Sequence, residues 1–243
     1  MGLLNNKKKV SRSKSIIFEK PGNDYVKEAY TRLKDNVLYL AIDGKNKVLQ
    51  VESSVSGEAK TSTLANLGVC LSLSGKKVCI IDLDFRKPRL HRAFHLDNVD
   101  GIAEYMLDSI DLEHLIKKTS FENCDVINRG SEISNSSVVL SSNKLQELFN
   151  LLREKYDFIL VDCPPVLLVS DFIHISRLTD GVIFVCAFGM TKKSQVREAI
   201  KQLKQNNIPI LGSVYSFYDP KKTNYAYEYL NYGYYGYNDK SKR

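Results

Sequence analysis

The sequence predicts a doubly wound α/β fold with a mainly parallel sheet. Short apolar runs that end in acidic residues alternate with segments of helical periodicity, which is the pattern of consecutive strand–helix–strand units. Strands of a parallel sheet are buried on both faces, so they appear as continuous apolar runs. With 243 residues, 43% of them hydrophobic, the chain is long enough for one such domain and its core.

The individual elements follow from apolar periodicity and from helix start and stop signals. Asp24 is the expected cap of a first helix, whose apolar stripe contains Tyr30, Leu33 and Leu40. The predicted helices are 28–40, 62–74, 143–155, 171–178 and 192–205. The predicted strands are 47–52, 78–82, 158–161, 181–186 and 208–215.

Composition divides the chain into three parts. Residues 1–22 are polar and basic and end in a Pro-Gly pair, so we expect a flexible N-terminal segment there. Residues 23–218 hold the predicted α/β domain. Residues 219–243 include seven of the fourteen tyrosines and too few aliphatic side chains to build a core. We therefore expect a disordered, Tyr-rich C-terminal tail.

The net charge of +7 lies at the two ends of the chain. The first 15 residues carry five basic side chains and no acid, and the last eight carry three basic side chains and one acid. Residues 16–235 are therefore formally neutral. A nucleic-acid binder is expected to have a basic face on its folded body, so we expect no nucleic-acid partner and only peripheral contact with anionic lipid.

Hydropathy and cysteine usage indicate a cytoplasmic protein. The longest apolar runs are about half as long as a membrane span requires, and the N-terminus lacks the apolar core of a secretory signal. The five cysteines occur singly and in odd number, which predicts neither a disulfide framework nor a zinc site.

A Ser-rich segment after the first predicted strand has the position of a phosphate-binding loop. Such loops bind phosphates through main-chain N–H groups, aided by the dipole of the following helix. Lys60 is expected to reach the β- and γ-phosphates, and Thr61 to bind Mg²⁺ through its hydroxyl. Ser54 and Ala59 stand where the common pattern has glycines, and a positive φ at Ala59 costs roughly 1–2 kcal/mol. The predicted nucleotide-binding residues are Ser56, Gly57, Glu58, Ala59, Lys60, Thr61 and Ser62.

Two of the predicted strands end in carboxylates. Asp82 and Asp84 follow the strand after the loop helix, and Asp162 ends another apolar strand. Ligands of open α/β sheets bind beyond the carboxyl ends of the strands, so we expect these side chains to converge on the phosphates. Mg²⁺ takes one or two carboxylates plus phosphate oxygens, and a further carboxylate can accept a hydroxyl proton. The motifs together predict ATP and Mg²⁺ as ligands.

Five segments of the chain resemble motifs of the bacterial tyrosine kinases (BY-kinases), in the single-chain cytoplasmic form found in capsule and exopolysaccharide systems. The five motifs occur along the chain in the same order as in that family. SSVSGEAKTS is similar to the family's SSxPGEGKST, IIDLDFRKP to LIDxDxRKP, and FILVDCPPV to IIDTPPV. The segment EAYTRLKDN at 28–36 resembles EAYRxLRxN, and the tail resembles the family's autophosphorylated tyrosine cluster.

The resemblance implies a P-loop NTPase type of fold and a protein-tyrosine kinase that autophosphorylates between subunits. It implies that Lys60, Asp82 and Asp84 are catalytic, with Asp82 as the base for the tyrosine hydroxyl. It further implies that Thr61, Asp84 and Asp162 hold Mg²⁺. The implied phosphoacceptors are Tyr225, Tyr227, Tyr229, Tyr232, Tyr234, Tyr235 and Tyr237.

The resemblance also implies partners. Glu28, Arg32 and Asn36 would lie at a subunit interface of a ring-like homo-oligomer, in which one subunit's tail enters its neighbour's active site. A separate membrane-anchored adaptor would activate the kinase and hold it at the inner face of the membrane. Protein tyrosines would be the substrates, and control of polysaccharide synthesis and export the context.

Two other interpretations stay open at this point. A partitioning or septum-positioning ATPase shares the fold and the acidic strands, but such proteins typically carry a second lysine five residues before the main one, where this chain has Val55. A catalytically weak or inactive scaffold, phosphorylated by others, is the second alternative, and Ala59 in the phosphate loop motivates it.

Overall fold

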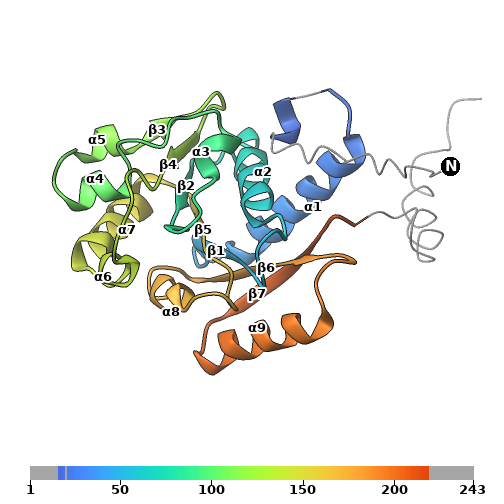
Figure 1. The fold of residues 1–243 in the computed structure, drawn as a ribbon. Helices are drawn as coiled ribbons and strands as arrows, with labels where there is room; N and C mark the ends of the chain where they lie inside the picture. The colour runs from blue at the N-terminus through green and yellow to red at the C-terminus, as the bar shows by residue number, and fades with distance from the viewer. Residues whose placement is uncertain (1–15, 20, 219–243) are drawn as a thin grey trace, which may run out of the picture.

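The computed structural model describes residues 16–19 and 21–218, in which a single seven-stranded sheet forms the centre (Figure 1). The predicted acceptor tyrosines, from Tyr225 onward, lie outside the described residues. The strand order is β3-β4-β2-β5-β1-β6-β7, and all pairs are parallel except β3 with β4. The strands are β1 (Val48–Ser53), β2 (Val78–Asp82), β3 (Lys117–Lys118), β4 (Cys124–Ile127), β5 (Phe158–Asp162), β6 (Gly181–Ala187) and β7 (Ile210–Ser216).

Helices cover both faces of the sheet, so the expected doubly wound architecture is confirmed. Side chains alternate along each strand between the two faces: Ile80 packs with the cluster under α1 and α2, whereas Cys79 and Ile81 pack with the cluster under α7. The helices are η1 (Ile17–Glu19), α1 (Asp24–Leu40), α2 (Lys60–Leu73), α3 (Leu90–Ala93), α4 (Ile102–Met106), α5 (Leu112–Leu115), α6 (Ser136–Leu140), α7 (Asn143–Lys155), α8 (Asp171–Ile175) and α9 (Lys193–Gln205).

The predicted elements are present, and their ends differ by a few residues. The helix 143–155 has the predicted bounds, whereas the helix predicted at 171–178 ends at Ile175. Asp24 is the first residue of α1 and not its cap; Asn23 occupies the cap position with φ 59° and makes no side-chain cap bond. Between residues 83 and 142, where we predicted no element, the chain adds α3 to α6 and the strands β3 and β4.

The end of the N-terminal segment is packed against the domain, contrary to the flexibility expected through residue 22. Ile16 is 1% exposed and belongs to the core under α1 and α2. The N–H of Ile17 donates to Asn66 Oδ1 on α2 at 2.7 Å, and the ring of Phe18 lies 6.3 Å from that of Tyr30. These contacts hold η1 across the first two helices.

None of the helices within 16–19 and 21–218 combines the length and the apolar character needed to cross a bilayer.

The chain at the start of α4 crosses closely over the loop that follows β4. The N–H of Ile102 donates to Asn128 O, and the N–H of Ala103 donates to Arg129 O. A Cβ added at Gly101 would lie 2.3 Å from Asn128 O and 2.3 Å from Gly130 N, both of them main-chain atoms. This crossing therefore requires glycine at position 101.

Replacing Gly101 with alanine should lower the free energy of unfolding by about 1–3 kcal/mol, because main-chain atoms must separate to admit the methyl group. Chemical denaturation measures this change. Gly212→Ala is the matched control, since its added Cβ meets nothing within 4 Å, and it should stay within about 0.5 kcal/mol of the parent. Equal effects of the two substitutions would contradict the close crossing.

A buried glutamate lies on β1, directly before the phosphate loop. Glu52 is fully buried; its Oε1 accepts from Gln50 Nε2 at 3.3 Å, and its Oε2 has no hydrogen-bond partner within the described part of the chain. Burial raises the pKa of Glu52 well above its ordinary 4.5, and the nearby Lys60 opposes this rise. The folded state therefore binds this proton more tightly than the unfolded state does.

Glu52 should make the stability pH-dependent. Its contribution is present below pH 4.5 and is lost as the pH rises through the raised folded pKa. Glu52→Gln removes the titration, so the melting temperature of the variant minus that of the parent should grow as the pH rises above 4.5. Thermal unfolding across this range measures the difference, with Glu154→Gln on the exposed face of α7 as control. Parallel pH profiles of parent and Glu52→Gln would refute the prediction.

Candidate functional site

The register of the parallel sheet brings the predicted acidic residues together. Asp82 at the end of β2 lies opposite Asp162 at the end of β5, and Asp162 in turn lies opposite Val51 on β1. Because β1 leads directly into the phosphate loop, the two aspartates and the loop share one edge of the sheet. Asp162 is close enough to Lys60 and to Asp84 for both charges to affect its pKa.

The phosphate loop presents main-chain donors that the protein leaves unused. In the described residues, no acceptor is found for the main-chain N–H groups of Ser56, Gly57, Ala59, Lys60, Thr61 and Ser62. Gly57 and Ala59 adopt positive φ values of 91° and 67°, and residues in the left-handed conformation make concave, anion-binding arrangements of N–H groups. The strained conformation considered for Ala59 is therefore the one present. Together with the N-terminus of α2, these donors suit a phosphate chain.

Lys60 and Thr61 begin α2 and lie against Asp162. The hydroxyl of Thr61 donates to Asp162 Oδ2 at 2.5 Å, and the side chain of Lys60 is largely buried. Burial raises the pKa of Asp162 to about 6, and Lys60 and the Thr61 hydrogen bond oppose the rise. The arrangement keeps a carboxylate, a hydroxyl and a cation within one small volume.

This donor set fits a magnesium ion that takes most of its ligands from water and phosphate. Asp162 Oδ1 is buried and has no hydrogen-bond partner among the described residues, so it remains able to accept from a metal-bound water. No cluster of three or more His, Cys, Asp or Glu side chains that could hold a metal occurs in that same part of the chain. A site with few protein ligands, completed by a nucleotide, is the kind that Mg²⁺ occupies.

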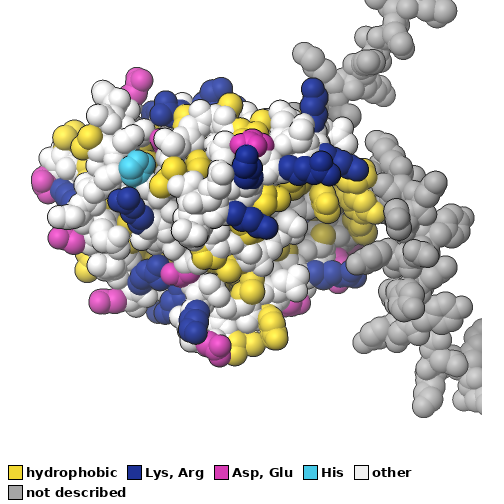
Figure 2. Space-filling view, turned by 90° about the horizontal axis from the view of Figure 1, so that it is seen from below, with side chains coloured by type: hydrophobic (Ala, Val, Ile, Leu, Met, Phe, Trp, Pro, Cys, Tyr) yellow, Lys and Arg dark blue, Asp and Glu magenta, His cyan; other side chains and the backbone are white. Residues whose placement is uncertain are grey.

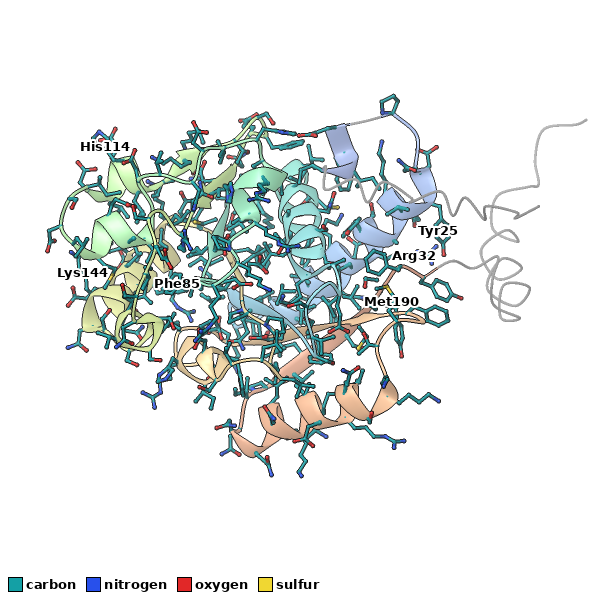
Figure 3. The ribbon with its side chains drawn as sticks, in the orientation of Figure 1. Tyr25, Arg32, Phe85, His114, Lys144 and Met190 are labelled. Carbon is teal, nitrogen blue, oxygen red and sulfur yellow. The ribbon has the colours of Figure 1, made fainter. Side chains whose placement is uncertain are left out.

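Asp82 and Asp84 hold the loop that follows β2. Asp82 is fully buried; its Oδ1 accepts from the N–H of Asp84 at 3.1 Å, and its Oδ2 accepts from those of Arg89 at 3.0 Å and Leu90 at 3.1 Å. Burial, followed by the charge of Asp162, raises the pKa of Asp82 well above its ordinary range. Asp84 is half-buried and accepts from the N–H of Lys87 at 3.0 Å. Phe85 comes next and is buried near the centre of the molecule (Figure 3).

Glu58, predicted to bind nucleotide, turns its side chain into the protein. Its Oε2 accepts from the N–H of Val55 at 2.7 Å, and its Oε1 accepts from the N–H of Ala187 at 3.3 Å and from the hydroxyl of Thr191. The hydroxyl of Ser216 donates to the carbonyl of Glu58 at 2.7 Å. Glu58 therefore fastens the phosphate loop to the ends of β6 and β7, and only its main chain is left for a ligand.

Two contributors to this site escaped the sequence reasoning. Glu52 lies among Lys60, Asp84 and Asp162 and influences the same electrostatic balance. An acid inside an apolar strand is the signal that could have identified it. The structural role of the Glu58 side chain gives no such signal, because two of its three partners, Ala187 and Thr191, lie more than a hundred residues away in sequence.

The residues predicted for a subunit interface form one exposed stripe on α1. Arg32 Nε lies 3.2 Å from Glu28 Oε1, and both side chains are more than half exposed, as the i,i+4 spacing allows. Asn36 is also exposed, one turn further along. Figure 3 shows Arg32 at the same end of the molecule as Tyr25 and Met190. The stripe is available to a partner, and the interface itself stays a prediction.

Comparison with known proteins gives a consistent result. A family model described as an AAA domain matches residues 46–211. The chain is 32% identical to the tyrosine-protein kinase YwqD of Bacillus subtilis over 212 residues, which is 87% of each chain. It is 30% identical to the putative tyrosine-protein kinase CapB of Staphylococcus aureus over 224 residues, covering 92% of this chain and 98% of CapB. Other relatives are longer: the chain spans 30% of a putative tyrosine-protein kinase in the cps region of Klebsiella pneumoniae.

Solved structures show the same relationship. The chimerical protein CapA2B2 superimposes with a TM-score of 0.78 and 27% identity, covering 82% of this chain and 88% of that one. The septum site-determining protein MinD of Pyrococcus horikoshii, solved with Mg-ADP, gives a TM-score of 0.61 and 26% identity over 76% of each chain. The fold is thus of the P-loop NTPase type, and by sequence and structure this chain belongs to the family of bacterial tyrosine-protein kinases.

Proposed function

We propose that this chain is an ATP-dependent protein-tyrosine kinase whose acceptors include the tyrosines at 225–237 of a neighbouring subunit. The observation that carries the proposal is the pairing of unused main-chain donors in the phosphate loop with a Thr61–Asp162 contact at the same sheet edge. The donors suit a triphosphate and the acids suit its cation. Membership of a family whose named relatives are tyrosine-protein kinases supports tyrosine as the acceptor.

The chemistry required is positioning with electrostatic stabilisation. The phenol oxygen forms a bond to the γ-phosphorus, the bond from that phosphorus to the β–γ bridging oxygen breaks, and ADP leaves. Lys60 and the loop N–H groups bind the phosphate oxygens on which negative charge gathers. Thr61, Asp84 and Asp162 would hold Mg²⁺, which would supply positive charge to the β- and γ-phosphates.

The proton of the phenol is assigned to Asp82. Its raised pKa makes its carboxylate a better proton acceptor than an ordinary aspartate. A carboxylate offers about four acceptor positions, and three of those on Asp82 are used by main-chain N–H groups. Because Asp82 is fully buried, a phenol contacts it only after groups around its carboxylate rearrange.

An exposed aromatic surface beside the phosphate loop supports a protein partner. Phe188 and Tyr215 at the ends of β6 and β7 are 40% and 68% exposed, with ring centroids 6.3 Å apart. Figure 2 shows exposed hydrophobic side chains gathered at one edge of the molecule. Exposed apolar patches mark interaction sites. We assign this surface to the cytoplasmic end of a membrane-anchored adaptor, in line with the likeness to CapA2B2.

The proposed cellular role is control of capsule or exopolysaccharide synthesis, from the inner face of the membrane, as the names of relatives such as the putative kinase in the cps region suggest. Ring-like assembly through the α1 stripe would let a tail from one subunit reach the site of another. The alternative function is a scaffold that binds the adaptor and is itself phosphorylated. The strained alanine at position 59 of the phosphate loop favours this alternative.

Lys60→Met should lower autophosphorylation by about 10²–10³-fold, because it removes one preorganised cation from the transferring phosphoryl group. Incubation of the full chain with Mg-ATP, with and without an adaptor segment, and an anti-phosphotyrosine blot measure this effect. Lys204→Met on the exposed face of α9 is the matched control and should not change the signal. Absence of signal from the parent protein under both conditions favours the scaffold.

Ala59→Gly should raise the free energy of unfolding by roughly 1 kcal/mol, since glycine tolerates the positive φ. The strain is present before any ligand binds, so nucleotide affinity should change by less than about threefold. Calorimetric titration with Mg-ADP and denaturation measure the two quantities.

Ala29→Gly on the exposed face of α1 is the control of opposite sign. It should lower the free energy of unfolding by about 0.5–1 kcal/mol. If Ala59→Gly instead raises the affinity more than about tenfold, the methyl group obstructs the phosphates, and the scaffold gains support.

A further inference from the structure

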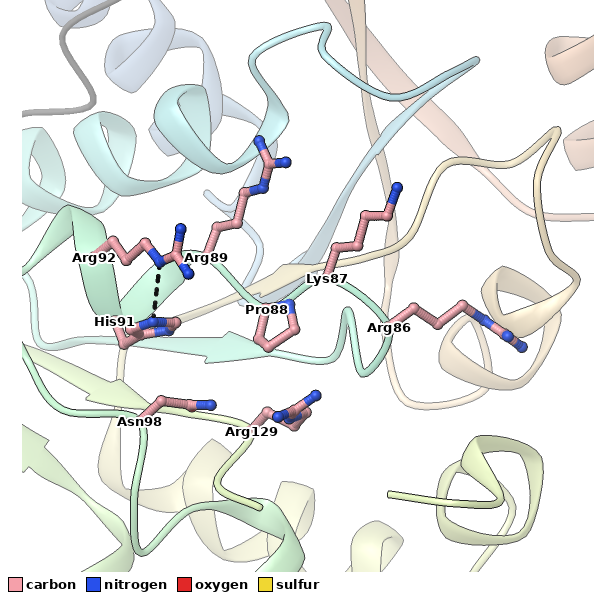
Figure 4. A pocket seen from close by; sticks show the side chains of 8 residues that line it. All are labelled: Arg86, Lys87, Pro88, Arg89, His91, Arg92, Asn98 and Arg129. Carbon is pink, nitrogen blue, oxygen red and sulfur yellow. Dashed lines mark hydrogen bonds between the residues drawn. The ribbon is translucent and has the colours of Figure 1, made fainter. Parts of the chain in front are cut away.

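A basic pocket lies beside the candidate active site and is lined by the loop after β2. It encloses about 380 Å³, and Figure 4 shows the side chains that surround it. Arg92 and His91 lie on one side of the pocket, and Asn98 and Arg129 face them from the other side. The charged or titratable side chains of the lining are Arg86, Lys87, Arg89, His91, Arg92 and Arg129.

Most of the positive side chains of this pocket have no carboxylate at ion-pairing distance. Arg86 Nε lies 3.6 Å from Asp171 Oδ2 and so has a partner. For Lys87, Arg89, Arg92 and Arg129, the part of the chain that the structure describes holds no carboxylate within ion-pairing distance. Like charges held this close repel one another, and a multivalent anion would relieve that repulsion while accepting several charge-assisted hydrogen bonds.

His91 lies in the same wall, against Arg92. Its Nε2 accepts from Arg92 Nε at 3.4 Å, and its buried Nδ1 has no partner among the described residues. A neutral ring that accepts at Nε2 carries its proton on Nδ1. Burial lowers the pKa of His91, and the charges of Arg92 and Arg129 lower it further while Asp97 opposes them. The ring is therefore held towards its neutral form and adds no positive charge to the wall.

Hydrogen bonds hold the wall formed by Asn98 and Arg129 in place before any ligand arrives. Asn98 Nδ2 donates to Gly130 O at 3.0 Å, and the N–H of Gly130 donates back to Asn98 Oδ1 at 3.2 Å. Arg129 Nη1 donates to Phe85 O at 3.0 Å, which ties the loop after β4 to the loop after β2. A preformed site loses less conformational entropy on binding than a flexible one does.

The pocket adjoins the acids of the candidate active site through its main chain. The N–H of Arg89 donates to Asp82 Oδ2, and that of Lys87 donates to Asp84 Oδ1. A ligand in the pocket therefore lies close to a tyrosine placed beside those carboxylates.

We propose that this pocket binds a phosphotyrosine of a partly phosphorylated C-terminal tail from a second copy of the chain, and so presents a neighbouring tyrosine for the next transfer. The inference rests on the proposed kinase function. Tail tyrosines such as Tyr225, Tyr227 and Tyr229 are two residues apart, or roughly 7 Å in an extended chain. One phosphorylated side chain can therefore occupy the pocket while an adjacent one reaches the active site.

Charge explains why the modified tail, and not the unmodified one, is the ligand. Residues 219–243 contain five basic side chains and three acidic ones, so the unphosphorylated tail is repelled by a cationic pocket. Each phosphate adds roughly −1.5 to −2 charges and three acceptor oxygens. The first phosphorylation thus converts the tail into a ligand, and later ones become faster.

The test measures binding in the full-length Lys60→Met variant, in which transfer does not interfere. Labelled peptides of residues 219–243 are titrated by fluorescence anisotropy at constant salt, either unmodified or carrying phosphotyrosine at position 232. The phosphopeptide should bind at least tenfold more tightly. Adding Arg92→Gln should reduce that advantage at least fivefold, because its guanidinium faces the pocket and holds no ion pair in the described chain. Arg197→Gln on the exposed face of α9 should leave the advantage unchanged.

Three results of the binding experiment would overturn the assignment. The two peptides could bind equally; inorganic phosphate or a short single-stranded oligonucleotide could bind as tightly as the phosphopeptide; or Arg92→Gln could leave the advantage intact. Because binding is measured without transfer, loss of kinase activity and loss of phosphotyrosine binding are separate outcomes. With the active parent protein, a peptide already phosphorylated at position 232 should also be phosphorylated further at least fivefold faster than the unmodified peptide, and equal rates would contradict the proposal.

Discussion

The structure depends on two aspartates being held side by side in the interior. Parallel pairing of β2 with β5 places Asp82 opposite Asp162, and both are almost fully buried. Two carboxylates so placed repel each other and lose hydration, and both effects disfavour their charged forms. The compensation comes from Lys60 and the Thr61 hydroxyl for Asp162, and from three main-chain N–H groups for Asp82. Such an arrangement costs stability, and it is expected where a cation has to be bound.

The phosphate loop provides the opposite kind of surface on the same sheet edge. Its main-chain donors lack acceptors, and its fastening by Glu58 to the ends of β6 and β7 keeps them in place. Donors on one side and acids on the other define a space suited to an anion and its cation together. Neither half alone is diagnostic, because helix N-termini and buried acids also occur in proteins that bind nothing there.

The sequence predicted the parts of the fold that carry a continuous signal. The strands that end in Asp82 and Asp162 are unbroken apolar runs, and α7 has a full amphipathic period, so their bounds are nearly as expected. The helices α3 to α6 have four or five residues each, too few to display a period. Asn23 displaced Asp24 from the cap because it tolerates the left-handed conformation found there, a choice that local sequence leaves open.

Some residues of the candidate site could be predicted from the sequence and others could not. Lys60, Thr61, Asp82 and Asp162 were predicted to converge because parallel strands place their carboxyl ends on one edge. The inward turn of Glu58 could not be read from the loop itself, because it depends on Ala187 and Thr191 far along the chain. Arg129 joins the basic pocket for a similar reason: β4 pairs with β2, which sets the loop after β4 against the one after β2.

The loop after β2 connects the two sites physically. Asp82 holds this loop through the main chain of Arg89, and the side chain of Arg89 lines the basic pocket. Any event that changes the hydrogen bonds of Asp82, such as contact with a phenol, therefore also changes the position of a side chain that lines the pocket. Conversely, an anion that draws Arg89 towards it acts on the groups that hold Asp82. The carboxylate of Asp82 and the arginine-rich wall of the pocket are thus connected by one short segment. Binding at either site therefore changes the free energy of binding at the other site.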